Sequence, residues 1–197
     1  MYDRDMPLIK AHALASPQGL HDVITFVLLT IQQPFQGVAT AMDRVRSEGR
    51  DCALLFGSKR LGYDYAALHC DVLHAAVVKA VEVQDTIGAL DVLTNVPGLG
   101  VVKAAFVAQL CGLEVGCLDV HNMRRFGLAP AAFKWPPKAK RETKLSKIAA
   151  YVETCAKLGG SRYLWDSWCE YVAGNRGNRR LTTGDAVSAF HVECFNL

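Results

Sequence analysis

Residues 95–105 read Asn95-Val96-Pro97-Gly98-Leu99-Gly100-Val101-Val102-Lys103-Ala104-Ala105, with two glycines between two apolar segments. Before it, Ile87, Leu90 and Leu93 recur at a spacing of three residues, which is typical of one face of a helix. After it, apolar residues continue at helical spacing as far as Leu110. The sequence therefore predicts two helices that are joined by a tight turn.

The composition of this turn suits the binding of a phosphate. Pro97 fixes φ and lacks an N–H, while Gly98 and Gly100 tolerate a positive φ and allow a ligand to approach the backbone closely. The first N–H groups of the following helix lack internal partners, so hydrogen bonds and the helix dipole favour an anion there. Lys103 adds a cation in the first turn. A corner between two helices that binds nothing has the same local sequence.

A carboxylate follows the turn at a short distance. Asp119 lies nineteen residues after Gly100, in the segment Leu118-Asp119-Val120-His121, between an apolar run and a further predicted helix. An aspartate in this place can cap the helix, which contributes about 1 kcal/mol, or it can act in acid–base chemistry. His121 is a weaker candidate, because a single histidine more often packs or caps.

These segments together resemble the helix-hairpin-helix DNA glycosylases related to endonuclease III. That family has Leu-Pro-Gly-Val-Gly, two variable residues and usually Thr-Ala at its hairpin, and Val-Asp-Thr-His at its catalytic aspartate. Residues 26–32, Phe-Val-Leu-Leu-Thr-Ile-Gln, are similar to the family's early helix, which ends in Leu-Leu-Ser-x-Gln. Residues 163–168 fall where the family has an aromatic helix behind the base pocket. The resemblance covers roughly residues 22–173.

The periodic segments have helical spacing and no strand is predicted, so the sequence indicates an all-α protein. The resemblance implies two helical lobes with the active-site cleft between them. One lobe spans residues 21–119 and contains the helix-hairpin-helix at 86–111, and residues 1–20 and 120–197 form the other. We expect helices near residues 21–33, 38–48, 64–81, 85–94, 101–111, 120–126, 142–157, 161–173 and 184–194.

The resemblance implies that the enzyme removes a base that has been flipped out of duplex DNA. Asp119 is then the catalytic residue, which stabilises the positive charge that develops on the sugar and orients the attacking water. Gln32 or Gln33 fills the gap that the base leaves. Tyr163, Trp165 and Trp168 are candidate walls of the base pocket, although large aromatic residues are usually part of the core.

The DNA contacts that we expect comprise the turn, the glutamines and three groups of basic residues. Cationic side chains bind phosphates and supply affinity rather than sequence choice. The residues are Pro97, Gly98, Leu99, Gly100, Val101, Val102, Lys103, Gln32, Gln33, His121, Arg124, Arg125, Lys138, Lys140 and Arg141. A further group, Arg176, Arg179 and Arg180, is better explained as a solvated face.

The chain departs from the family at the lysine. Bifunctional members have a lysine at the second position after the last hairpin glycine, where this chain has Val102 and the lysine comes one residue later. One residue along a helix rotates a side chain by about 100°, so Lys103 is expected to point elsewhere, toward the DNA backbone. This implies a monofunctional enzyme, unless a local shift of the helix places Lys103 where the family has its catalytic lysine.

The cysteines bear on cofactors and on the cellular compartment. An iron–sulfur cluster needs a compact array of cysteines, whereas Cys155, Cys169 and Cys194 are widely separated. We therefore expect no cluster and no metal site, and the only ion to consider is a monovalent cation on the hairpin backbone. Seven unpatterned cysteines predict a reducing, cytoplasmic location.

The composition limits the class of protein and its partners. An apolar fraction of 51% in 197 residues predicts an ordered globular chain, which we expect to be a monomer. The longest apolar run, Val23 to Ile31, is too short to span a bilayer, and the acidic start of the chain is no signal peptide. The net charge is only +3, so duplex DNA as the partner is indicated by local groups of basic residues and not by the overall charge.

Three functions remain open at this point. The first is a monofunctional DNA glycosylase for a damaged, mispaired or modified base. The second keeps the fold but changes a base substituent instead, as proposed for some bacteriophage relatives in hypermodified DNA. The third is a DNA-binding module without catalysis, for which Asp119 would have no use. The identity of the base cannot be read from the sequence.

Overall fold

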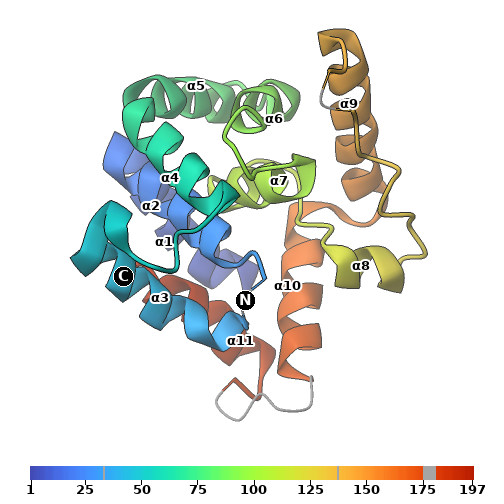
Figure 1. Cartoon of the computed structure of the whole chain (residues 1–197). Coiled ribbons are helices and arrows are strands. Elements are labelled where there is room, and N and C mark those ends of the chain that lie inside the picture. Colours follow the sequence, from blue (N-terminus) through green and yellow to red (C-terminus); the bar gives the residue numbers. More distant parts are fainter. Residues whose placement is uncertain (33, 137, 175–180) are drawn as a thin grey trace.

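A computed structural model of the chain describes residues 1–32, 34–136, 138–174 and 181–197 (Figure 1). All regular secondary structure within these residues is helical, which confirms the all-α prediction. The helices are α1 (Tyr2–Ala15), α2 (Pro17–Leu29), η1 (Phe35–Gly37), α3 (Val38–Glu48), η2 (Gly49–Asp51), α4 (Ser58–Leu68), α5 (Cys70–Glu82), α6 (Thr86–Leu93), α7 (Val101–Leu110), α8 (Val120–Arg125), α9 (Arg141–Lys157), α10 (Gly160–Ala173) and α11 (Gly184–Glu193).

Helix α2 is the central element. Its buried residues include every one from Val23 to Leu29, and it contacts α1, α3, α4, α5 and α7. Ser16 caps its N-terminus by accepting a hydrogen bond from the N–H of Gly19 at 3.1 Å, and Pro17 occupies the first helical position, where a proline costs no hydrogen bond. The apolar run of the sequence is therefore a core helix.

Helix α1 was not among the predicted helices. Pro7 within it opposes a helix on propensity alone. Met6, Ile9 and Ala13 are nevertheless buried at helical spacing, and α1 packs on α2, α7, α10 and α11. Tertiary packing of this apolar face stabilises the helix where its local sequence does not.

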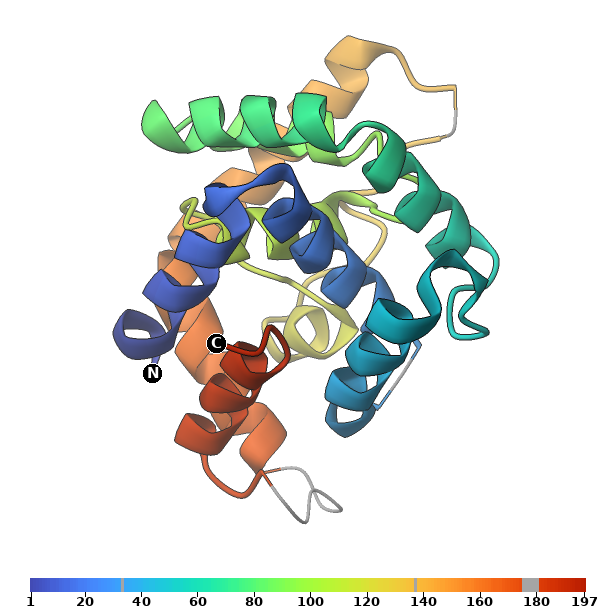
Figure 2. The same cartoon turned by 90° about the vertical axis from the view of Figure 1, so that its left-hand side faces the viewer.

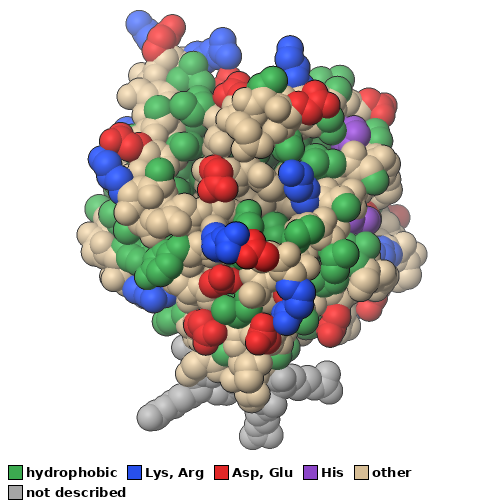
Figure 3. Space-filling model, turned by 180° about the vertical axis from the view of Figure 1, so that it is seen from behind, with side chains coloured by type: hydrophobic (Ala, Val, Ile, Leu, Met, Phe, Trp, Pro, Cys, Tyr) green, Lys and Arg blue, Asp and Glu red, His purple; other side chains and the backbone are tan. Residues whose placement is uncertain are grey.

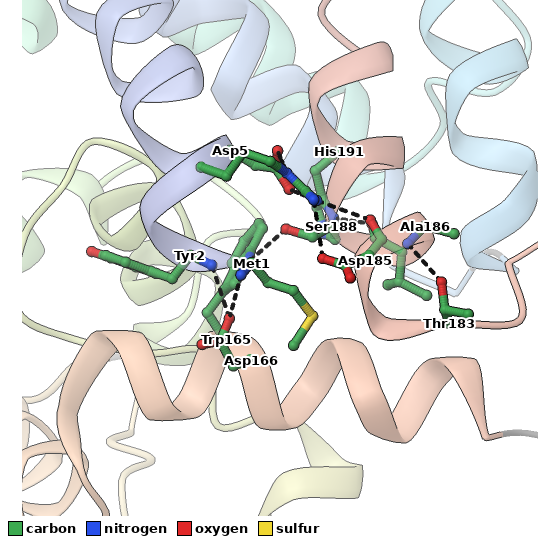
Figure 4. A network of polar contacts seen from close by, with 12 residues as sticks. Met1, Tyr2, Asp5, Trp165, Asp166, Thr183, Asp185, Ala186, Ser188 and His191 are labelled. Atoms are coloured by element: carbon green, nitrogen blue, oxygen red, sulfur yellow. Dashed lines mark hydrogen bonds and ion pairs between the residues drawn. The ribbon is translucent and has the colours of Figure 1, made fainter.

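Polar contacts also attach α1 to the end of the chain (Figure 4). The backbone N–H of Tyr2 donates to Oδ1 of Asp166 in α10 at 2.9 Å. Arg4 forms ion pairs with Asp5 and with Asp185 of α11, at 2.8 and 3.1 Å. These contacts join α1 to the last two helices of the chain, which are more than 140 residues away in the sequence.

The segment predicted as one helix, residues 64–81, is instead parts of two. The backbone of His69 leaves the helical region, with φ −112° and ψ 18°, between α4 and α5. Helix α4 begins earlier, after Gly57 with its positive φ of 55°, and it includes Gly62. A Cβ on Gly62 would lie 2.3 Å from the carbonyl oxygen of Pro97, so this glycine lets α4 pack directly against the turn.

One continuous hydrophobic core connects the elements. It contains buried residues from α1 to α11, including Leu110, Trp165 and Val187. Figure 2 shows α1, α10 and α11 next to one another, and these three helices contact each other pairwise. Helix α9 packs against α6 and α10, so the C-terminal helices enclose the segment between α7 and α8.

Figure 3 shows the face of the molecule opposite to that in Figure 1. Acidic and basic side chains are interspersed on it, and no continuous basic surface is visible among the residues described there. A polyanion therefore has no evident electrostatic preference for this face. In the described part of the chain, no helix has both the length and the apolar character that a membrane span requires.

Candidate functional site

A cavity of about 340 Å³ lies where the end of α2, helix α7, the start of α8 and helix α10 meet. Its volume falls in the range of sites for small organic ligands. The lining residues are Thr30, Pro34, Phe35, Lys103, Phe106, Gln109, Cys117, Asp119, His121, Leu164, Trp165, Trp168, Tyr171 and Val172. The cavity thus brings together Asp119, Lys103 and two of the predicted aromatic residues.

Asp119 is both the cap of α8 and a cavity residue. Its Oδ1 accepts a hydrogen bond from the backbone N–H of Asn122 at 2.8 Å, as the capping alternative predicted. Its Oδ2 accepts from the indole Nε1 of Trp168 at 3.4 Å. The carboxylate is half-buried and lines the cavity. Capping therefore does not exclude a chemical role, because only one of the two oxygens serves the helix.

Tyr151 of α9 holds the segment that precedes Asp119. Its hydroxyl donates to the carbonyl oxygen of Gly116 and accepts from the N–H of Leu118, both at 2.8 Å. The ring is fully buried, and burial raises the pKa of its phenol well above 10. The phenol therefore stays protonated, and one side chain satisfies two buried backbone groups next to Asp119.

Two amide side chains hold Cys117, between those two backbone groups. Oε1 of Gln109 accepts from the N–H of Cys117 at 3.3 Å, while Nε2 donates to the carbonyl oxygen of Ser161 at 2.9 Å. Nδ2 of Asn122 donates to the carbonyl oxygen of Cys117 at 2.9 Å. Side chains from α7, α8 and α9 thus determine the path of the segment, and with it the position of Asp119.

Lys103 lines the cavity, although its shift by one residue from the position of the family's lysine predicted a different direction. Its Nζ donates to Oγ1 of Thr30 at 3.0 Å, lies 5.8 Å from the ring centre of Phe106, and lines the same cavity as Asp119. A lysine has a four-carbon stem, so the direction of its Cβ does not decide where its ammonium lies. No ion pair between Lys103 and Asp119 occurs in the described structure.

The three predicted aromatic residues of α10 lie on different faces of the helix. Trp165 and Trp168 line the cavity, and the indole of Trp165 donates to Oγ of Ser188 at 3.0 Å (Figure 4). Tyr163 does not line it and is 48% exposed, so this prediction is wrong. Two residues before Trp165 correspond to a rotation of about 200° around the helix, which places Tyr163 on the other face.

Three further residues of this site, Phe35, Tyr171 and His191, were not predicted from the sequence. Phe35 and Tyr171 line the cavity. His191 of α11 is fully buried behind it, with its ring centre 4.8 Å from Phe35 and 4.4 Å from Trp165. Burial lowers the pKa of His191 to about 4, so the ring is neutral at pH 7. Its place in the site could not be predicted, because a single histidine in an apolar helix forms no recognisable sequence motif.

Gln32 lies beyond the helix that was predicted to contain it. Helix α2 ends at Leu29, four residues before the predicted end. Gln32 is exposed, in a turn with a positive φ of 55°, and Gln33 lies outside the described residues. Pro34 lines the cavity next to this turn. Gln32 therefore lies in a turn and not at a helix terminus, and it does not line the cavity.

The turn between α6 and α7 has the predicted place and form. The N–H of Leu99 donates to the carbonyl oxygen of Val96 at 3.0 Å, and Gly98 has a positive φ of 85°. Leu99 and Val101 are buried, Pro97 and Val102 are half-buried, and Gly98 and Gly100 are exposed. Packing of the apolar members therefore presents the two glycines to solvent.

The two glycines differ in what they do for the fold. A Cβ on Gly98 would lie 3.2 Å from the carbonyl oxygen of Ser58, on a backbone that disfavours L side chains. Gly100 has an ordinary φ of −69° and open space where a Cβ would lie. Nothing within the described protein therefore requires a glycine at position 100.

The basic residues that were predicted to contact DNA differ in their interactions with the rest of the protein. Arg125 donates to Oγ of Ser167 at 2.6 Å, and Arg141 forms an ion pair with Asp91 at 2.9 Å. The remaining predicted contacts in the described chain are exposed residues, and they are His121, Arg124, Lys138 and Lys140. The group Arg176, Arg179 and Arg180 lies outside the described residues.

Comparison of the chain with protein-family models, with curated proteins and with solved structures found no match. All seven cysteines are free, and the described residues contain no group of three or more His, Cys, Asp or Glu side chains that could hold a metal ion. Neither finding tests the prediction that the protein needs no cofactor.

Proposed function

We propose that the protein is a monofunctional DNA glycosylase, which hydrolyses the bond between a flipped-out base and its deoxyribose in duplex DNA. The observation that carries this proposal is the placement of Asp119. Its carboxylate is held by backbone and side-chain hydrogen bonds in a cavity with two tryptophan walls. The turn with Gly98 and Gly100 leads into α7, and residues of α7 line the same cavity.

The chemistry follows from the residues of the cavity. A flat base would stack on aromatic side chains such as Trp168 and Phe35, which is favourable for any base. Departure of the base leaves positive charge on the sugar, and Asp119 would stabilise this charge and orient a water molecule toward C1′. The neutral His191 behind the wall adds no competing positive charge.

The turn would bind the phosphates on the side of the extruded nucleotide. Its exposed glycines and the first N–H groups of α7 suit an anion. The open space at Gly100 fits a ligand that approaches the backbone closely. In this proposal the helices divide into the two lobes of a helix-hairpin-helix glycosylase, with the cavity in the cleft between them.

The position of Lys103 favours a second version of the reaction. Its side chain lies in the same cavity as Asp119, so after loss of a proton to solvent its amine could attack C1′. The base would then leave with the electrons of the glycosidic bond and take up a proton, and opening of the sugar ring would give a Schiff base. Reduction with borohydride would trap this adduct. An adduct that is lost in Lys103→Gln would overturn the monofunctional assignment, whereas its absence in the wild type supports hydrolysis by water.

The proposal is tested by incubating the protein with duplexes that carry single damaged or modified bases. Mass spectrometry detects released base, and treatment with alkali reveals the abasic site. Free base together with an alkali-labile strand is the expected result. An intact strand with an altered base mass would instead establish modification of a base substituent. Tight binding without any change would establish a binding module.

A further inference from the structure

A second cavity, of about 330 Å³, lies against the turn and shares Lys103 with the first cavity. It is formed by the start of α7, the end of α8 and residues 130–135. Its lining residues are Thr94, Leu99, Gly100, Val101, Val102, Lys103, Met123, Pro130, Phe133, Lys134 and Trp135. Among the described residues, Lys103 alone lines both cavities.

The chemistry of the second cavity is apolar and aromatic with a cationic edge. Leu99, Met123 and Phe133 are buried and form its apolar part, and the indole of Trp135 is half-buried. Lys134 is exposed at its edge. No carboxylate is among the described residues that line it. A ligand that suits such a site has a flat aromatic part and an anionic group, as a nucleotide does.

We propose that this cavity binds the base of the nucleotide adjacent to the flipped-out one, stacked on Trp135. Neighbouring nucleotides of a strand share one phosphate, and the two cavities share one cation. The shared phosphate would lie against Lys103, and the next phosphate near Lys134. This inference rests on the proposed function, because it takes the extruded nucleotide to occupy the first cavity.

The three tryptophans of the chain allow the two cavities to be observed separately. Protein labelled with 5-fluorotryptophan has one fluorine signal for Trp135 and one each for Trp165 and Trp168, which line the first cavity. The signal of Trp135 is assigned by its loss in Trp135→Phe. The probes are a single-stranded tetrathymidylate, thymidine 5′-monophosphate and deoxyribose 5-phosphate.

We expect the tetranucleotide to shift the Trp135 signal in a saturable way and deoxyribose 5-phosphate to leave it unchanged. Trp135→Ala should weaken binding of the tetranucleotide about tenfold or more, because one stacked base is lost, and Trp135→Phe should restore most of it. Lys134→Gln should weaken binding and lower its salt dependence. Lys79→Gln is the matched control, since this exposed lysine of α5 lines neither cavity.

A Trp135 signal that does not move at saturating tetranucleotide overturns the inference, and the proposed function survives if the other two signals move. A monophosphate that binds at Trp135 as tightly as the tetranucleotide also overturns it, because the site would then serve a free nucleotide. Movement of the Trp135 signal without base release in any duplex supports nucleotide binding here and counts against the glycosylase.

Discussion

The segment that carries Asp119 and the turn between α6 and α7 are both close to the cavity, yet they are held in different ways. Residues 116–119 have no regular structure of their own, and side chains from three other helices hold their backbone. The turn is maintained by its own hydrogen bond and by Gly98. The comparison indicates that the first region depends on distant residues, while the second depends on local sequence.

The largest expected effect is on catalysis at Asp119. We predict that Asp119→Asn lowers base release at least about a hundredfold, because the charge that stabilises the transition state is removed. An amide oxygen can still cap α8, so the unfolding free energy and the affinity for duplex DNA should change little. Full activity of this variant in a single-turnover assay would show that the site has been assigned wrongly.

The neutral His191 predicts a pH dependence of stability. Its pKa is about 4 in the folded protein and about 6.5 when unfolded, so the unfolded state binds more protons between these values. Stability contributed by the neutral ring is fully present above pH 6.5 and falls by about 3 kcal/mol as the pH decreases to 4. Urea unfolding at pH 7.5 and pH 5 should show a smaller difference for His191→Leu than for the wild type.

The exposed His121 provides the control for this measurement. His121→Gln should leave the pH dependence of unfolding as it is in the wild type. If His191→Leu and the wild type lose the same stability between pH 7.5 and pH 5, the histidine behind the cavity wall does not titrate as its burial implies.

Tyr151→Phe would disturb the first region without touching Asp119. The change leaves the N–H of Leu118 without its acceptor and the carbonyl of Gly116 with only the Cys155 thiol, 3.5 Å away, which should cost about 2 kcal/mol of unfolding free energy. The exposed Tyr163 offers a matched control, and Tyr163→Phe should change stability by less than about 0.5 kcal/mol. Equal effects of the two variants would contradict the view that distant side chains hold the segment.

Alanine at the two glycines of the turn would separate conformation from ligand binding. Gly98→Ala should destabilise the protein by about 1–2 kcal/mol, because its positive φ and the nearby carbonyl of Ser58 oppose a Cβ. Gly100→Ala should cost less than about 1 kcal/mol and still weaken duplex binding, measured by fluorescence anisotropy. Unchanged DNA affinity in Gly100→Ala would remove the argument that a ligand approaches the backbone there.

The smallest effect is expected at the cation between the two cavities. Lys103→Gln should reduce the affinity for duplex DNA and lower the slope of log K against log salt by about one. Thr30→Val is a useful companion, since it removes the hydroxyl that accepts from the ammonium of Lys103 and donates to the carbonyl oxygen of Val27 while leaving the charge of Lys103 in place. A salt slope identical to that of the wild type in Lys103→Gln would show that the lysine contacts no phosphate.

Local patterns were sufficient for some elements of the fold. Helices α3, α6, α7, α8 and α9 start and end within a residue or two of their predicted places, because apolar spacing and breaker residues mark them. Helix α1 was missed, since its packing outweighs a sequence with Pro7. The break at His69 was missed too, because no glycine or proline marks it.

What the sequence by itself determined is the all-α class, the turn with its two glycines and the place of Asp119 at the start of a helix. These features depend on residues that are neighbours in the chain. Only the tertiary structure decided that Lys103 enters the cavity, that Tyr163 does not, and that Tyr151 and His191 support it. These placements depend on which helix faces touch and on how far long side chains reach, and neither is encoded in the spacing of a single segment.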